Sequence, residues 1–126
     1  MSTSEIETKT LRGSAQRARY VAALAENLES VVEQLSAIPA VQRVILFGSY
    51  AAGRRDLFTD LDILVVMDSP LSFVPRNADL AGRVRAGVAL DLLAYTPQEM
   101  DQMRDRPFIR HALETGKVLY EKRCSQ

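Results

Sequence analysis

The chain has 126 residues, of which 47% are apolar, and its 16 lysines and arginines balance its 16 aspartates and glutamates. This length allows one domain with a sizeable core, and the neutral charge argues against a nonspecific nucleic-acid binder, which would carry a basic excess. One cysteine and one histidine exclude a disulfide framework and a metal site built on several imidazoles. No apolar run approaches the ~20 residues of a membrane span, and the polar N-terminus lacks a signal peptide, so a cytoplasmic protein is expected.

The first predicted element is a long amphipathic helix. Residues 1–13 are polar and end in Gly13, which predicts a flexible tail followed by a single domain over 14–126. From Ser14, a suitable N-cap, apolar residues recur at helical spacing between Val21 and Leu35, and the helix should end before Pro39. This apolar stripe fits either the core or the surface of a homodimer.

Short strands and helices alternate through the rest of the chain. The expected elements are a strand over 43–47, a turn with a brief helix over 48–53, a strand over 61–67, a helix over 72–86, a strand over 88–95, a helix capped by Thr96 with Glu99, a helix over 107–115 and a strand over 117–122. Without repeats or a low-complexity linker, this order predicts an α+β or α/β fold, a sheet of about four strands covered by helices.

Two carboxylates stand at the start of a strand that should be buried. Asp60 and Asp62 directly precede the apolar run 63–66, and their spacing of two places both side chains on one face of the strand. Two carboxylates this close repel each other unless one is protonated or a cation lies between them. Magnesium suits such a pair, because it prefers one or two carboxylates together with substrate phosphates. On its own, the motif also fits a solvated strand entry.

Two further features extend this pair. Gly48 and Ser49 follow a strand, where a glycine allows close approach of a ligand and helix-opening amides can hold a phosphate. Asp91 interrupts the apolar strand 88–95, and if that strand lies beside the Asp60/Asp62 strand, three carboxylates converge. A phosphate cradle beside magnesium ligands predicts phosphoryl or nucleotidyl transfer.

Together these residues resemble the signature of the polymerase-β-like nucleotidyltransferases, G-S-x3-G-x5-[ST]-D-x-D, which runs here from Gly48 to Asp62. The chain is most similar to the minimal nucleotidyltransferases, the subfamily of the MntA-like antitoxins of HEPN/MNT toxin–antitoxin pairs. Asp91 fits the third aspartate of that subfamily. The turn departs from the family pattern, because it reads GSYAAG without internal arginines, and Arg54 and Arg55 follow it as candidate replacements.

The resemblance implies a role for each of these residues. Asp60, Asp62 and Asp91 would be catalytic and hold two magnesium ions, and Gly48, Ser49, Gly53, Arg54 and Thr59 would bind the nucleotide. The implied reaction transfers AMP from ATP to a hydroxyl of a HEPN-type helical toxin.

Two alternatives stay open at this point. One is an antitoxin that acts by binding its partner with little or no catalysis. The other is a small-molecule nucleotidyltransferase, although those enzymes add a helical domain for which 126 residues leave no room. Outside the motif, His111 lacks a carboxylate at helical spacing and is assigned to the surface or to packing, and Cys124 is read as a free thiol near the C-terminus.

Overall fold

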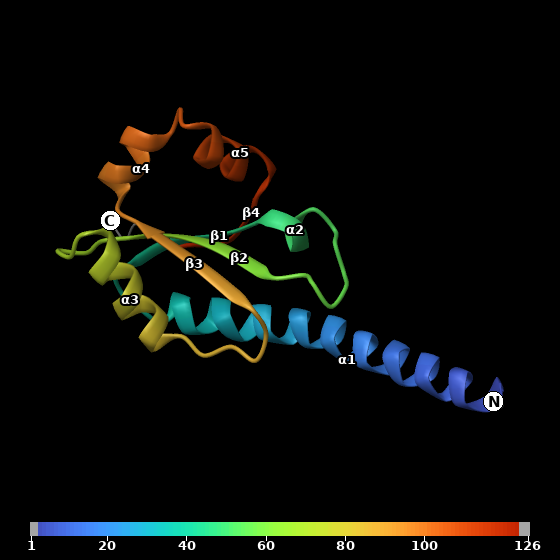
Figure 1. Ribbon diagram of the computed structural model, residues 1–126. Coiled ribbons are helices and arrows are strands. Elements are labelled where there is room, and N and C mark those ends of the chain that lie inside the picture. Colours follow the sequence, from blue (N-terminus) through green and yellow to red (C-terminus); the bar gives the residue numbers. More distant parts are fainter. Residues whose placement is uncertain (1–2, 124–126) are drawn as a thin grey trace.

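A computed structural model describes residues 3–123 (Figure 1). It opens with α1, which spans Thr3–Ser36 and extends well past the edge of the sheet at its N-terminal end. The prediction that this helix begins at Ser14 is therefore wrong, and residues 3–13 of the expected tail are helical. A glycine inside a helix costs only about 1 kcal/mol relative to alanine, so Gly13 does not stop it. Residues 1 and 2 of that tail, and Cys124, lie outside the described residues.

Four strands form one mixed sheet in the order β3-β2-β1-β4. The strands are β1 (Val41–Phe47), β2 (Leu61–Met67), β3 (Leu90–Tyr95) and β4 (Lys117–Glu121). The central strands β1 and β2 pair antiparallel, β4 joins β1 antiparallel, and β3 joins β2 in parallel. The predicted α+β fold with a four-stranded sheet is confirmed, and β2 has the predicted bounds.

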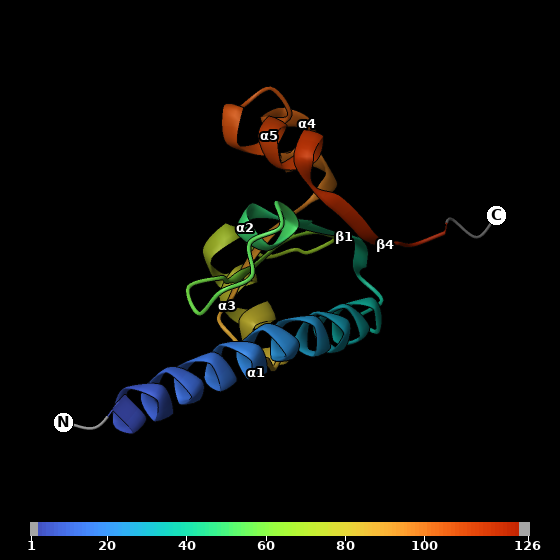
Figure 2. The ribbon, with the colours of Figure 1, turned by 90° about the vertical axis from the view of Figure 1, so that its right-hand side faces the viewer.

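Helices cover both faces of the sheet, which gives three layers (Figures 1 and 2). On one face lie α1 and α3 (Phe73–Arg83), and on the other lie α4 (Pro97–Met103) and α5 (Pro107–Thr115). Leu24, Val31 and Leu35 of α1 are fully buried against the first face. The apolar stripe of α1 is therefore core, which resolves the choice between core and dimer surface.

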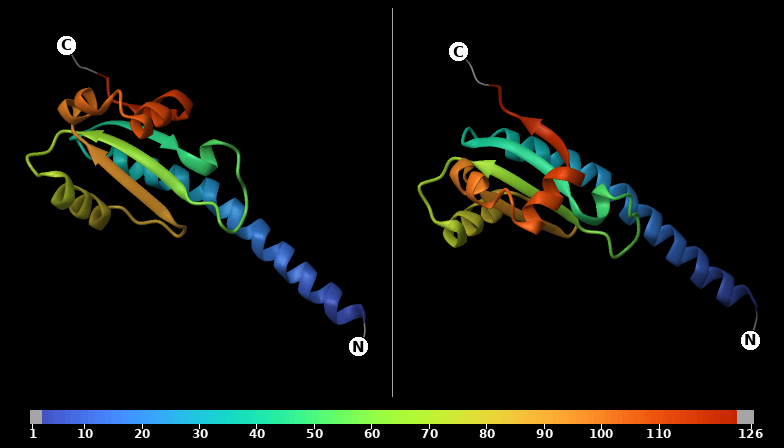
Figure 3. Two further views of the ribbon diagram at one scale, coloured as in Figure 1. Left: turned by 45° about the horizontal axis from the view of Figure 1, so that its top comes forward. Right: turned by 90° about the horizontal axis from the view of Figure 1, so that it is seen from above.

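The two faces of the sheet follow from strand alternation. Leu61, Ile63 and Val65 point into the core under α1, whereas Leu64 and Val66 point toward α4 and α5. Asp62 is spaced by two from Leu64, so its side chain points to the same face of the sheet, the face covered by α5. Figure 3 shows that α2 and the loop that connects it to β2 lie at one end of the sheet.

Polar contacts fix the helices against the edge strand β3. The predicted capping box is confirmed, because the Thr96 hydroxyl accepts from the Glu99 amide and the Glu99 carboxylate accepts from the Thr96 amide. The same carboxylate forms an ion pair of 2.6 Å with the buried Arg76 of α3. The Asn77 side chain accepts from the Ala94 amide at 2.8 Å and donates to the Ala94 carbonyl at 3.1 Å. It therefore satisfies backbone groups of the edge strand that a further strand would otherwise pair with. Between Thr3 and Arg123, no helix is long and apolar enough to cross a membrane.

Candidate active site

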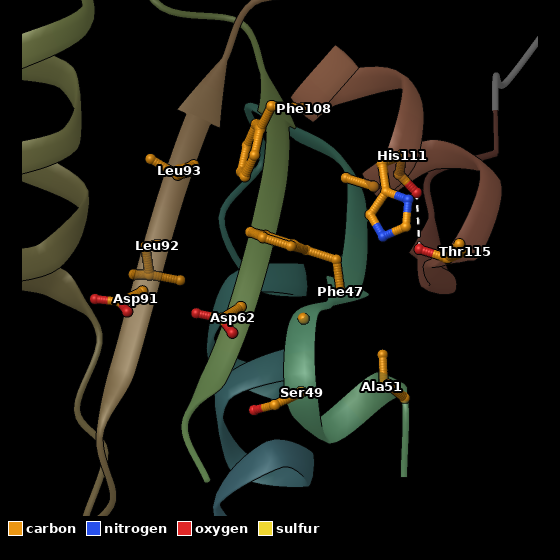
Figure 4. A pocket seen from close by; sticks show the side chains of 13 residues that line it. Phe47, Ser49, Ala51, Asp62, Asp91, Leu92, Leu93, Phe108, His111 and Thr115 are labelled. Atoms are coloured by element: carbon orange, nitrogen blue, oxygen red, sulfur yellow. Dashed lines mark hydrogen bonds between the residues drawn. The ribbon is translucent and has the colours of Figure 1, made fainter. Parts of the chain in front are cut away.

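The centre of the site is a pair of carboxylates on neighbouring strands. Because β2 and β3 run in parallel and in register, Asp62 lies directly beside Asp91 (Figure 4). Partial burial raises the pKa of Asp62 to about 6, with further contributions from the charges of Asp91 and Asp60 and from a hydrogen bond with Asp91. A neighbouring carboxylate and partial removal from water both disfavour the ionised form of Asp62. Asp62 therefore holds its proton more tightly than an isolated aspartate does.

The third predicted carboxylate, Asp60, does not line the cavity that holds the other two. Asp60 directly precedes β2 and is partly exposed. Across residues 13–123, no three His, Cys, Asp or Glu side chains gather into a ready-made metal cluster. Of the three carboxylates that were expected to converge, Asp62 and Asp91 line the cavity together. Asp60 is nevertheless close enough for its charge to raise the pKa of Asp62.

The glycine–serine turn packs directly against Asp62. The short helix α2 (Gly48–Ala51) follows β1, and Gly48 has a φ of +76°. A Cβ at Gly48 would lie 2.1 Å from Oδ2 of Asp62, so only glycine allows the backbone and the carboxylate to occupy these positions. Ser49 lies at the same mouth of the cavity as Asp62 (Figure 4). The predicted proximity of the turn and the aspartate is therefore present in the fold.

A cavity of about 860 Å³ extends from the carboxylates toward α5. Its polar end consists of Gly48, Ser49, Asp62 and Asp91, and its other walls are mostly apolar. Those walls comprise Phe47, Ala51, Ala52, Leu92, Leu93, Phe108, His111, Ala112 and Thr115. His111, which the sequence assigned to the surface or to packing, lines this cavity (Figure 4). His111 reaches the cavity because α5 packs against β1, which is far away in the sequence. No local sequence signal predicts this contact.

The other predicted nucleotide contacts are engaged within the protein. Arg54 pairs with Asp56 through Nε and Oδ2 at 2.8 Å, and Arg55 lies 3.5 Å over the ring of Tyr50. Thr59 is fully buried, and its hydroxyl bonds to the carboxylate of Asp56. These contacts shape the segment that leads into β2. A direct nucleotide contact of Arg54 or Thr59 stays a prediction.

The same applies to Gly53, which closes the turn after α2. Its φ of +102° is accessible mainly to glycine, and its amide donates to the Tyr50 carbonyl at 3.1 Å. The turn after α2 therefore requires a glycine at this position. Gly53 does not line the cavity, and its contact with a nucleotide stays a prediction.

Side chains at seven-residue spacing on α1 hold the segments that precede both aspartate strands. A spacing of seven places Tyr20, Asn27 and Gln34 on one face of the helix. The Tyr20 hydroxyl donates to the Thr59 carbonyl at 2.8 Å, Asn27 accepts from the Gly87 amide at 2.6 Å, and Gln34 bonds to both backbone groups of Arg85 at 2.8 Å. The long helix therefore positions both segments from which the carboxylate strands start.

Comparison with known proteins identifies the family of this chain. The sequence model of the nucleotidyltransferase domain matches residues 26–120. A protein of Methanocaldococcus jannaschii described as a "putative protein adenylyltransferase" is 33% identical over 82 residues, which cover 64% of this chain and 79% of the relative.

Solved structures show the same fold. A "putative nucleotidyltransferase" from Sulfolobus solfataricus superposes with a TM-score of 0.52 at 20% identity, over 87% of each chain. A structure of a mutant of the toxin–antitoxin complex MntA–HpeT gives a TM-score of 0.52 at 24% identity, over 76% of this chain and 73% of the other. With a family match over three quarters of its length and the paired aspartates beside a glycine–serine turn, the chain belongs to the nucleotidyltransferase domain family.

Proposed function

We propose that this nucleotidyltransferase transfers AMP from ATP to a hydroxyl group of a partner protein and depends on magnesium. The observation that supports this most is the Asp62–Asp91 pair at one end of a cavity of about 860 Å³, a volume within the range of ligand pockets. The description of the Methanocaldococcus relative as a protein adenylyltransferase supports the choice of AMP and of a protein acceptor.

The donor set fits magnesium. Asp62 and Asp91 offer carboxylate oxygens side by side, and a cation between them would relieve the repulsion that helps to raise the pKa of Asp62. In this proposal Asp62 and Asp91, together with Asp60, would hold two ions. Bound magnesium would neutralise phosphate charge and lower the pKa of the attacking hydroxyl.

The residues of the chain itself would orient the reactants. Gly48 brings its backbone against Asp62, and the Ser49 hydroxyl stands at the same mouth to contact phosphate. Asp91 lies on the edge strand and is exposed, so an acceptor hydroxyl can reach it from outside. As the hydroxyl oxygen bonds to the α-phosphorus, its proton passes to Asp91 and pyrophosphate leaves with the electrons of the broken bond.

The proposed acceptor is a HEPN-type helical toxin, for which this chain would be the antitoxin. The likeness of the fold to the antitoxin complex MntA–HpeT supports this class of partner. One observation favours the rival role of an antitoxin that only binds: no lysine or arginine lines the cavity within residues 13–123, so a triphosphate would depend on the metal for charge compensation.

Intact-mass spectrometry separates the two roles. The protein is incubated with ATP, magnesium and a helical partner of the HEPN type, and the partner should gain one or more AMP masses. Asp91→Asn should abolish this gain, while Asp105→Asn, which removes an exposed carboxylate that does not line the cavity, should not. A partner that is inhibited at unchanged mass, and equally by Asp91→Asn, would show that inhibition occurs by binding alone.

Binding of the donor can be tested without any partner. A ligand that binds only the folded state raises its melting temperature, so ATP should raise the melting temperature strongly with magnesium and weakly without it. An equal increase with and without the metal would contradict the assignment of the carboxylates to magnesium.

A further inference from the structure

We infer that the α5 side of the cavity, formed by Phe108, His111 and Thr115, is the subsite for the purine base of the nucleotide. This assignment rests on the proposed function, which places the phosphates at the opposite end beside Asp62. It adds the part of the substrate that the aspartates and the glycine–serine turn do not contact.

Phe108 supplies an unused aromatic surface. Its ring meets the buried Phe47 edge to face, with centroids 5.6 Å apart and planes at 90°. This contact holds the side chain at the cavity, yet 53% of Phe108 remains exposed. A base that stacks on an aromatic ring covers such a surface and gains affinity without sequence-specific contacts. Phe108 is therefore placed and oriented by its neighbour, while much of it stays available to a ligand.

Polar groups on the next turns of α5 suit the edge of a base. His111 and Thr115 are one turn apart and both line the cavity (Figure 4). The Thr115 hydroxyl donates to the His111 carbonyl at 2.7 Å, which leaves its oxygen free to accept. Among the described residues, no protein group forms a hydrogen bond with the imidazole of His111. A neutral imidazole can both donate and accept, as recognition of a base edge requires.

The position of the carboxylates decides which end of the nucleotide lies here. Neither end of the cavity has a lysine or arginine among its described lining residues, so phosphates would be held where Asp62 and Asp91 can bind magnesium, whereas an uncharged base suits the mostly apolar α5 walls. The acceptor hydroxyl would come from the side of Asp91, which is exposed on the edge strand β3. The volume of about 860 Å³ admits a purine together with its ribose and phosphates.

Comparing ATP with inorganic tripolyphosphate tests this subsite. Calorimetric titration in the presence of magnesium is carried out on the wild type, Phe108→Ala and the matched control Phe58→Ala. Phe58 is an aromatic residue that is 80% exposed and lies outside the cavity lining. Phe108→Ala should weaken ATP binding by about 5- to 150-fold, the range of one base–aromatic stack, and leave tripolyphosphate binding unchanged. Phe58→Ala should change neither affinity.

Other results would contradict either the base subsite or the proposed function. Equal losses for ATP and tripolyphosphate in Phe108→Ala, or no loss for either, would overturn the base subsite while leaving the proposed function in place. A loss of tripolyphosphate affinity in His111→Ala would place the imidazole at the phosphates instead. If the wild type binds neither ligand, the proposed function fails and the base subsite fails with it. Circular dichroism of each variant verifies that the fold is retained.

Discussion

Replacing Asp62 with asparagine should stabilise the ligand-free protein at neutral pH, although the residue lies in the proposed catalytic site. In the folded protein, partial burial and the nearby carboxylates raise the pKa of Asp62 from its ordinary value of 3.8 to about 6. The ionised side chain is therefore less favourable in the folded state than in the unfolded chain. Asparagine has nearly the same shape without the charge, so the substitution removes this cost.

The size of the effect follows from the pKa difference. Between 3.8 and about 6, at about 1.36 kcal/mol for each pKa unit, the upper bound is about 3 kcal/mol. Because Asp62 keeps part of its surface in water, solvent screening reduces this to about 1–2 kcal/mol. For a domain of this size, that corresponds to an increase in melting temperature of about 3–10 °C.

The pH dependence has a definite sign. The folded protein keeps the Asp62 proton up to about pH 6, whereas the unfolded chain releases it near pH 3.8. The contribution of Asp62 to folding stability therefore falls as pH rises through this window. The stability advantage of Asp62→Asn should be close to zero near pH 4 and complete by pH 7.

Chemical denaturation of both proteins at pH 4, 5, 6 and 7 measures this difference directly. Asp105→Asn, which removes an exposed carboxylate, is the matched control and should show no comparable advantage. An advantage of equal size at every pH, or a loss of stability at pH 7, would refute the reasoning. In the mass assay, Asp62→Asn should lower transfer by orders of magnitude, because the metal supplies most of the charge stabilisation.

Three further substitutions test the frame around the site. Gly48→Ala would place a Cβ 2.1 Å from Oδ2 of Asp62 at a φ of +76°; we expect a cost of about 1–2 kcal/mol and loss of magnesium-dependent ATP binding in calorimetry. Arg76→Met leaves the carboxylate of Glu99 without its ion pair of 2.6 Å and should cost about 1–3 kcal/mol in urea unfolding, because Glu99 remains in contact with water; a neutral effect would show that the pair contributes no stability. Tyr20→Phe removes the bond of 2.8 Å to the segment before β2 and should cost about 1 kcal/mol while lowering kcat more than it changes KM; unchanged kinetics would show that α1 does not position the site.

Local sequence signals were sufficient for the elements around the site. The continuous apolar run after Asp62 located β2 at its observed bounds, Leu61–Met67, and the Thr96–Glu99 pair predicted a capping box that is present. Gly116 ends α5 as expected. The error at the N-terminus has a physical cause, since Gly13 is a weak helix breaker between residues that favour helix.

The sequence by itself indicated a nucleotidyltransferase. The glycine–serine turn and the Asp60-x-Asp62 motif lie within a short stretch of the chain, so their spacing can be read without knowledge of the fold. Tertiary structure alone decided which groups meet. The parallel register of β2 and β3 brings Asp91 beside Asp62 in the cavity, whereas Asp60, one residue before β2, does not line it. The packing of α5 over β1 turns His111 into a cavity residue, which no local pattern shows. These contacts join residues that are far apart in the chain, so they depend on how the layers pack and not on the preferences of any one segment.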